Sequence, residues 1–384
     1  MIIYNVYQKW KGPSAVEEII GKVFQELCEI LRTIGLSMLK GLMTNRWLQI
    51  VVQVRKGKAI HSLSSRLHRV FQRLHKYPND IVIETACVCN LNCTICRSVK
   101  ADLGRKNRFM SFDLFKKIID DIVPVCNTIG VSYCGEPLLS KDIFKMVRYA
   151  ADKGMCVSML TNGVLLNAEA RKGLLDSGLN FMAISMDGAS KHTYESIRIG
   201  APFETLVENI RLFVKERNHR RLSYPAIDLQ MVVTQKNIHE VDAFEKLARD
   251  LGVDRAYLKS LHIDRSKEDT EYVKNLEKDY FVNSTMLPTR YVVNKQGNLE
   301  LKDKGLCPQK VRTPVITTDG DVLPCCFDIF GEHVLGNIAN QRFLDIWNSG
   351  KYTDFRRDLA LHRKLPMCAN CLPSNSKTTN KILF

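Results

Sequence analysis

Residues 81–96 read IVIETACVCNLNCTIC, a short apolar run that leads directly into closely spaced cysteines. The apolar run predicts a strand over residues 81–86. The three thiols that follow it have the spacing C-x3-C-x2-C: Cys89, Cys93 and Cys96. A structural zinc site and a plain electron-carrying [4Fe-4S] cluster both take four protein ligands. Three cysteines therefore predict a cluster with one iron free for another ligand. Cys87 is a weak fourth candidate, because it would lie on the strand rather than in the loop.

Downstream of this loop, apolar strands alternate with amphipathic helices. The strands are predicted at 128–133, 156–160, 181–185, 226–233 and 255–259, and the helices at 111–122, 141–153, 168–177, 203–217 and 238–251. Strands separated by helices of this length pair in parallel through right-handed crossovers. The sequence thus predicts an α/β fold, either a full or partial barrel or a doubly wound sheet. In each case the chemistry belongs at the carboxyl ends of the strands.

Breaks in the pattern divide the chain into four parts. A helical pattern over residues 15–76 ends at a Tyr-Pro-Asn-Asp turn, which predicts a basic helical extension at 1–78 and a core at 79–263. Residues 264–305 are charged and less regular, so we expect a connection there. The remaining residues, 306–384, carry a compact module with clustered cysteines.

The charge of the 384-residue chain is unevenly placed. Its formal net charge is +15, and residues 31–79 contain ten Lys or Arg but no Asp or Glu. This segment is either a solvated helical hairpin or a peripheral contact with an anionic membrane surface. RNA is the weaker partner, because no aromatic platform accompanies the charge. No apolar run reaches the length of a membrane span, and no signal peptide is recognisable, so we expect a cytoplasmic protein. Peripheral attachment to a membrane is the second expectation.

The cysteine loop resembles the signature of radical S-adenosylmethionine (SAM) enzymes, including an apolar residue, Ile95, before its third cysteine. Further motifs follow the predicted strands in order. Gly135-Glu136-Pro137 resembles the GGEP-type motif of that family, with Cys134 in place of the usual first glycine. Thr161-Asn162-Gly163 and Ser185-Met186-Asp187-Gly188 follow the next two strands. Each motif alone is an ordinary turn sequence, and their joint occurrence carries the resemblance.

The resemblance implies a partial (β/α)6 barrel and two bound cofactors, SAM and a [4Fe-4S] cluster held by three cysteines. The amino and carboxylate groups of SAM would chelate the free iron, and a reduced cluster would cleave SAM to a 5′-deoxyadenosyl radical. An electron donor such as flavodoxin or ferredoxin is implied as a partner. The residues implied to contact SAM are Ile95, Gly135, Glu136, Pro137, Thr161, Asn162, Ser185, Asp187 and Arg198.

The C-terminal cysteines suggest a second metal site with the spacing C-x17-C-x42-C-x2-C: Cys307, Cys325, Cys368 and Cys371. On chemistry alone, four thiolates suit a structural zinc as well as an iron-sulfur cluster. The stretch GDVLPCC at 320–326, with Trp347 beyond it, resembles the SPASM extension of radical SAM enzymes. No cysteine follows Cys371, so the resemblance implies one auxiliary [4Fe-4S] cluster, as in the shortened twitch module. Cys326 is the alternative ligand to Cys325. We prefer Cys325, because it completes a Gly-x4-Cys pattern with Gly320.

An auxiliary cluster bound only by cysteines has no open iron, so its expected role is to accept an electron. The sequence therefore predicts an oxidoreductase that dehydrogenates or epimerises a carbohydrate, a cyclitol or a lipid-linked small molecule. The alternative is a SPASM-type peptide or protein maturase, and a remote alternative is a non-catalytic iron-sulfur carrier. No catalytic side chain is assigned. Cys134 and Cys156 are weak candidates for a hydrogen donor. The first candidates for substrate contact are Asp228, Gln230, Tyr257 and Lys259, although a buried structural role is more common for such residues.

Overall fold

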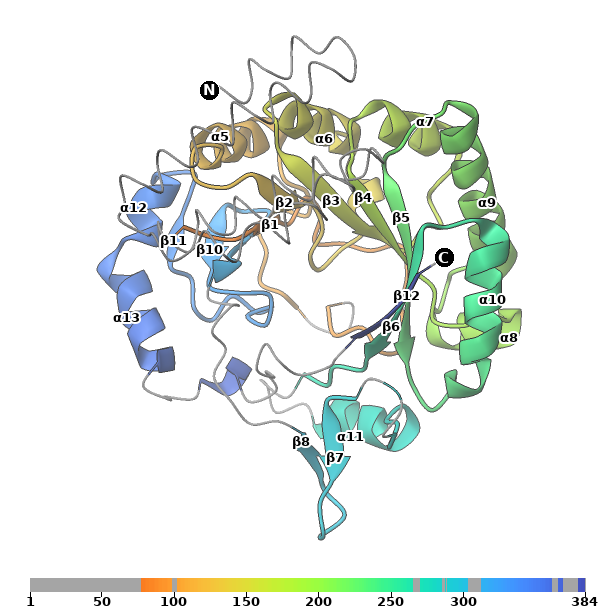
Figure 1. The fold of residues 1–384 in the computed structure, drawn as a ribbon. Coiled ribbons are helices and arrows are strands. Elements are labelled where there is room, and N and C mark those ends of the chain that lie inside the picture. Colours follow the sequence, from red (N-terminus) through yellow and green to blue (C-terminus); the bar gives the residue numbers. More distant parts are fainter. Residues whose placement is uncertain are drawn as a thin grey trace, which may run out of the picture. The chain divides into compact units, whose positions relative to one another are not determined.

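A computed structural model describes residues 77–98, 102–264, 270–284, 287, 289–302, 312–360, 365–368 and 379–383. Its centre is a row of six parallel strands, in which each strand pairs with the next one along the chain (Figure 1). The strands are β1 (Ile81–Ile83), β2 (Thr128–Gly130), β3 (Cys156–Thr161), β4 (Phe181–Ser185), β5 (Ala226–Val233) and β6 (Arg255–Ser260). This order is that of a partial (β/α)6 barrel, as predicted.

The crossover helices lie on the outer side of the strands (Figure 1). They are α5 (Phe112–Ile122), α6 (Ile143–Asp152), α7 (Ala168–Asp176), α9 (Phe203–His219) and α10 (Val241–Leu251). Ser111 caps α5 as its sequence predicts, because its Oγ accepts a hydrogen bond of 3.2 Å from the amide of Leu114. The short helix α8 (Lys191–Ile197) was not predicted, and the helix predicted at 238–251 is divided into a 3-10 turn, η3 (Ile238–Glu240), and α10.

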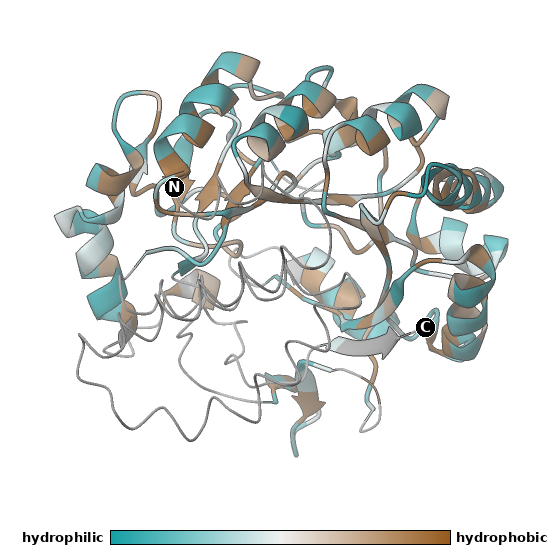
Figure 2. Ribbon diagram, turned by 45° about the horizontal axis from the view of Figure 1, so that its top comes forward, coloured by the Kyte–Doolittle hydropathy of each residue, from teal (hydrophilic) through white to brown (hydrophobic). Residues whose placement is uncertain are grey.

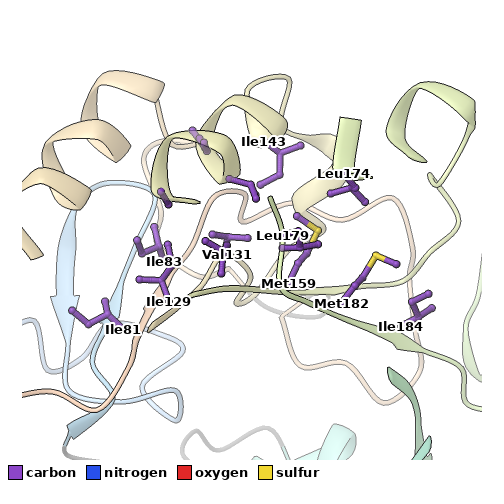
Figure 3. Close-up of a cluster of buried hydrophobic side chains, with 14 of the residues drawn as sticks. Ile81, Ile83, Ile129, Val131, Ile143, Met159, Leu174, Leu179, Met182 and Ile184 are labelled. Carbon is purple, nitrogen blue, oxygen red and sulfur yellow. The ribbon is translucent and has the colours of Figure 1, made fainter. Parts of the chain in front are cut away.

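The main core lies between the strands and these helices. Alternate residues of β5, namely Ile227, Leu229, Met231 and Val233, are at most 3% exposed, as expected for the helix-facing side of a strand. Figure 2 shows the same division by hydropathy, with hydrophobic strands and hydrophilic outer helix surfaces. Figure 3 shows isoleucine, valine and methionine side chains from β1 to β4 gathered against residues of the neighbouring helices. The opposite, inner face of the strands is therefore the face available for chemistry.

The C-terminal segment extends the barrel sheet at both edges. β9 (Val315–Ile316) pairs in parallel with β1, and β10 (Asp321–Leu323) and β11 (Gly336–Asn337) follow it in antiparallel order. At the other edge, β12 (Thr379–Leu383) pairs antiparallel with β6. The described strands of the module predicted at 306–384 thus share one ten-stranded sheet with the barrel. The edge strands β1 and β6 gain backbone partners in this way.

Three short helical elements complete the described C-terminal part: α12 (Phe343–Trp347), α13 (Gly350–Ala360) and η5 (Pro366–Cys368). The aromatic ring of Trp347 stacks on Phe343 and lies 4.7 Å from the ring of Tyr352. All three side chains are buried and belong to the main core. This part of the chain is therefore packed as an extension of the barrel.

The segment expected as a connection is also more ordered than predicted. It contains helix α11 (Thr270–Asp279) and a hairpin of β7 (Tyr291–Val293) and β8 (Leu299–Leu301), which lies beside α11 in Figure 1. Its buried side chains Leu276, Tyr280 and Tyr291 form a second core together with Ile197, Leu261 and Ile263 of the barrel region. The charged residues of this segment had hidden the apolar spacing. The described part of 264–305 therefore packs against the end of α8 and the chain that follows β6.

The helical extension predicted at 1–78 lies almost wholly outside the described residues, which begin at Tyr77. The basic segment 31–79 and its expected membrane contact fall outside them as well. Within the described ranges, no helix has the length and hydropathy needed to cross a bilayer.

A buried ion pair ties the barrel to the C-terminal strands. Glu84, at the end of β1, is fully buried, and its Oε2 lies 2.9 Å from Nε of Arg105 and accepts the amide of Thr318 at 3.2 Å. Burial raises the pKa of Glu84, and the positive charge of Arg105 opposes that shift. The adjacent Asp319 accepts amide hydrogen bonds from Lys106 and Asn107. The chain after the cysteine loop is thereby fastened to the turn between β9 and β10.

Replacing Arg105 by Met is expected to lower the free energy of unfolding by about 3 to 5 kcal/mol, because it leaves the Glu84 carboxylate buried without a cation. The double variant Glu84→Gln with Arg105→Met should recover part of this loss. Chemical denaturation of the anaerobic holoprotein measures both. Equal stability of Arg105→Met and the wild type would contradict the role of the pair.

Candidate active site

Glu136 lies where the loops after β2 and β3 meet. Its carboxylate is 2% exposed and accepts three hydrogen bonds, from the Thr161 hydroxyl at 2.7 Å, the Asn162 amide at 2.8 Å and the Leu138 amide at 3.1 Å. A carboxylate offers about four acceptor positions, so one position is left for a further donor such as an amino group. The predicted residues Glu136, Thr161 and Asn162 are therefore brought together, and buried Pro137 begins the 3-10 turn η2 (Pro137–Leu139) beside them.

Gly135 brings this loop against the cysteine loop. A Cβ atom at Gly135 would lie 2.4 Å from the carbonyl oxygen of Ala86 and 2.6 Å from that of Val88. The amide of Glu136 donates to the same Val88 oxygen at 2.9 Å. Only glycine allows this approach. The unusual Cys134 therefore leaves the close packing intact, since the required glycine is Gly135.

Asn162 connects the Glu136 loop to the first cysteine. Its side-chain nitrogen donates to Oδ1 of Asn90 at 2.9 Å and lies 3.8 Å from the sulfur of Cys89. The same residue donates its backbone amide to Glu136. The loops after β1, β2 and β3 thus meet around one asparagine.

A second group of predicted residues lies on the other side of the cysteine loop. Arg198 donates from Nε to Oδ2 of Asp187 at 2.7 Å, and Oδ1 of Asp187 accepts the amide of Val232 at 2.7 Å. Burial raises the pKa of the Cys93 thiol to about 11, and the positive charge of Arg198 opposes this shift. Arg198 therefore lies near Cys93 and is neutralised by Asp187. Ser185 is half-buried at the end of β4, and its predicted contact with SAM stays a prediction.

The cysteine loop is held mainly by backbone contacts. The amides of Asn92 and Thr94 donate to the carbonyls of Ile199 and Ile197 at 3.0 and 2.9 Å. The carbonyl of Ile95 accepts a hydrogen bond of 3.3 Å from Tyr272 in α11, and the Ile95 side chain packs against the second core. Ile95 is thus an anchor of the loop, a role that sequence analysis could not assign because Tyr272 is far away along the chain.

The three thiols of the loop fit an iron-sulfur cluster in their chemistry. Cys93 is buried, while Cys89 and Cys96 are half-buried, so the site is sheltered but reachable. Burial also raises the pKa of Cys89. A bound metal centre would stabilise the thiolates in this setting, because coordination deprotonates a thiol. Within the described ranges, no three His, Cys, Asp or Glu residues are grouped around a single metal-ion position. A cluster instead distributes its ligands over several irons.

The C-terminal cysteines are only partly described. Cys325 is buried, Cys326 is exposed and Cys368 is half-buried, whereas Cys307 and Cys371 lie outside the described residues. The hydroxyl of Tyr133, from the loop before Glu136, donates to the carbonyl of Cys326 at 3.3 Å. Tyr133 therefore connects the loop after β2 to the turn that carries Cys325 and Cys326, and nothing in its local sequence had marked it.

Three further expectations are settled by position. Asp228 accepts hydrogen bonds of 2.5 and 2.9 Å from Arg255, and both residues lie in the amino-terminal halves of their strands. Asp228 therefore forms a structural ion pair with Arg255, in place of the substrate contact considered for it from the sequence. Cys156 begins β3, so it lies at the end of the strand opposite to the motifs. Cys134 is buried beside Gly135.

Comparison with known proteins matches this architecture. Residues 83–248 match the radical SAM superfamily model, and residues 307–372 match the SPASM iron-sulfur cluster-binding domain. The chain belongs to the radical SAM superfamily and carries a C-terminal SPASM module. Its cofactors are SAM and a [4Fe-4S] cluster, and the SPASM module implies auxiliary iron-sulfur clusters.

Several curated relatives cover most of the chain. A tungsten-containing aldehyde ferredoxin oxidoreductase cofactor-modifying protein of Pyrococcus furiosus is 28% identical over 314 residues, which are 76% of this chain and 86% of the relative. An AdoMet-dependent heme synthase of Methanosarcina barkeri is 26% identical over 73% of this chain and 85% of its own length. The mycofactocin maturase MftC of Mycolicibacterium smegmatis is 25% identical over 80% of this chain and 78% of its own length.

Solved structures support the fold alone. SuiB of Streptococcus suis superposes with a TM-score of 0.54 at 15% identity, over 84% of this chain and 80% of SuiB. The enzyme anSMEcpe with bound AdoMet gives a TM-score of 0.51 at 19% identity, over 72% of this chain and 82% of that chain.

Replacing Gly135 by Ala is expected to push the loop containing Val88 and Cys89 away from Glu136, at a cost of about 1 to 3 kcal/mol in stability. We expect less iron per chain and weaker SAM binding. Iron analysis and calorimetry of the anaerobically reconstituted protein measure both. Gly350→Ala is the control, because a Cβ there meets nothing within 4 Å. Full iron content and unchanged SAM affinity in Gly135→Ala would be inconsistent with this packing.

Proposed function

We propose that this protein is a radical SAM oxidoreductase that removes a hydrogen atom from a small-molecule substrate and passes the remaining electron to one auxiliary cluster in the SPASM module. Cys89, Cys93 and Cys96 hold the SAM-binding cluster. Cys307, Cys325, Cys368 and Cys371 hold the auxiliary cluster. A flavodoxin or ferredoxin is the proposed electron donor.

One contact carries this proposal. Beyond β6, the ring of His262 lies 4.7 Å from the ring of Phe327, which directly follows Cys325 and Cys326. The carboxyl end of the barrel therefore adjoins the turn that carries the auxiliary cysteines. Such proximity supports electron transfer out of a substrate held at the barrel end, and an outgoing electron makes the net reaction an oxidation.

The protein's own groups orient the cofactor and shelter it. When bound, the cluster and SAM supply a 5′-deoxyadenosyl radical that abstracts a hydrogen atom. The carboxylate of Glu136 is held in place by Thr161 and Asn162. It offers one free acceptor position to the methionine amino group of SAM. The second core and Tyr272 cover the cysteine loop and limit access of water.

The relatives narrow the substrate class. Two of them are named for modifying a cofactor or making heme. These names favour a cofactor or cofactor precursor over the carbohydrate, cyclitol or lipid-linked substrate that the sequence first suggested. Dehydrogenation is the preferred outcome, and epimerisation would need a hydrogen donor, for which buried Cys134 is poorly placed.

A second candidate function is that of a peptide maturase. Its support is the similarity to the mycofactocin maturase over 80% of the chain. The sequence of the extension predicted at 1–78 has a helical apolar pattern, whereas a peptide-recognition domain would call for the alternating pattern of strands. Small-molecule oxidation therefore remains the preferred proposal.

Changing Cys89, Cys93 and Cys96 together to alanine is expected to reduce bound iron from about eight to about four per chain. Release of methionine and 5′-deoxyadenosine after reduction with dithionite should be lost. Iron and sulfide analysis with product chromatography measures both. Cys156→Ala, a thiol at the other end of β3, should change neither value.

The wild-type iron count tests the cluster number independently. About twelve irons per chain would indicate two auxiliary clusters and contradict the single one proposed. Zinc in place of iron, or a fully reduced holoprotein that leaves SAM intact, would exclude the proposed function.

Single variants at the adjacent cysteines distinguish the auxiliary ligands. Cys325→Ser is expected to remove the signal of the auxiliary cluster from the electron paramagnetic resonance spectrum, because Cys325 is buried, while Cys326→Ser keeps that signal. SAM cleavage should survive in both. The opposite pattern would assign Cys326 as the ligand.

A further inference from the structure

Uncharged side chains occupy the inner face of the sheet along β3, β4 and the carboxyl-terminal half of β5. Alternation with the buried helix-facing residues places Leu160, Ala183, Ser185 and Gln230 on this face. Leu160 is 41% exposed, although it lies within a central strand. A hydrophobic side chain that is accessible on the inner face of a barrel is suited to contact a bound molecule.

The carboxylates near this face already have cations. Asp228 is paired with Arg255 toward the amino ends of the strands. Asp187 is paired with Arg198 at the carboxyl ends, and its other oxygen binds the Val232 amide. Neither acid needs a further positive charge.

Lys259 is an additional cation on the same face. Its strand register places it beside Val232 on β5, whose amide binds Asp187. Within the described ranges its ammonium makes neither an ion pair nor a hydrogen bond, although Asp187 and Asp228 are near enough to act on it electrostatically. Burial lowers the pKa of Lys259, the negative charges of Asp187 and Asp228 oppose that shift, and the positive charge of Arg290 adds to it. Because each of these two carboxylates is already paired with an arginine, an ammonium at this sheltered position favours an anionic ligand.

The position of Lys259 relates it to both cysteine regions. On one side, Asp187 is bonded to Arg198, and Arg198 lies near Cys93. On the other side, the chain continues from β6 to His262, whose ring contacts Phe327 beside Cys326. A group held by Lys259 would therefore lie between the SAM-binding region and the auxiliary cysteines.

We propose that Lys259 is the subsite for an anionic group of the substrate, a carboxylate or a phosphate, and that it positions the substrate between the two cluster regions. This inference rests on the proposed function, since it requires a substrate at the barrel end. An ammonium binds such a group as a point charge, so Arg can replace Lys in charge, whereas Met retains only the length of the side chain.

The test uses the anaerobically reconstituted, SAM-loaded holoenzyme and three probes: succinate, inorganic phosphate and neutral succinamide. We expect calorimetry to show tighter binding of one anion than of succinamide, and Lys259→Met should raise its dissociation constant about tenfold or more. Lys259→Arg should stay within a few-fold of the wild type. Preference for succinate or for phosphate identifies the anionic group.

Lys246→Met is the matched control, because Lys246 is exposed on the outer helix α10 and loses the same charge. An equal loss of binding in this control, an unchanged dissociation constant in Lys259→Met, or no anion preference in the wild type would overturn the proposal. Iron content and SAM cleavage are measured in parallel and should be unchanged in Lys259→Met. If iron is lost from that variant, Lys259→Gln takes its place. Absence of SAM cleavage in the wild type would count against the proposed function. The comparison of succinate and phosphate with succinamide would still test whether Lys259 binds an anion.

Discussion

The buried carboxylate of Glu136 is the interaction on which the candidate site depends. It gathers donors from the loops after β2 and β3, and its neighbour Gly135 approaches the backbone at Ala86 and Val88 so closely that no side chain fits. The first cysteine of the cluster loop follows Val88 directly. A buried carboxylate is stable only when its acceptors are satisfied, so the three loops must keep one arrangement. That arrangement leaves one acceptor position of the carboxylate open, which is the position proposed for an amino group.

The SPASM module is structurally inseparable from the barrel in the described ranges. Its first strand adds to β1, and the Glu84–Arg105 pair fastens its first turn to the segment behind the cysteine loop. Two cysteine regions that lie more than two hundred residues apart in the sequence are therefore held by one sheet. A shared sheet of this kind suits electron transfer, whose rate falls steeply as the distance between donor and acceptor grows.

The electrostatics of the barrel end distinguish structural charges from available ones. Asp228 and Asp187 are each neutralised by an arginine. The arginine paired with Asp187, Arg198, also lies near Cys93. Lys259 remains on the same wall without such a partner among the described residues. Membership of the radical SAM superfamily defines the cofactor chemistry, whereas the substrate depends on side chains of this kind, in which distant relatives need not agree.

The six barrel strands, their crossover helices, the cysteine loop and the residues of the strand-end motifs could be predicted from the sequence. These features are local: hydrophobic periodicity, an N-cap such as Ser111, and a fixed spacing of thiols are all readable within about twenty residues. Three findings required the folded chain: Ile95 anchors the cysteine loop, Asp228 pairs with Arg255, and the turn after β10 is contacted by Tyr133 at the Cys326 carbonyl and by His262 at the Phe327 ring. Each of these contacts joins residues from different strands or loops, and a contact between distant segments leaves no pattern in either one alone.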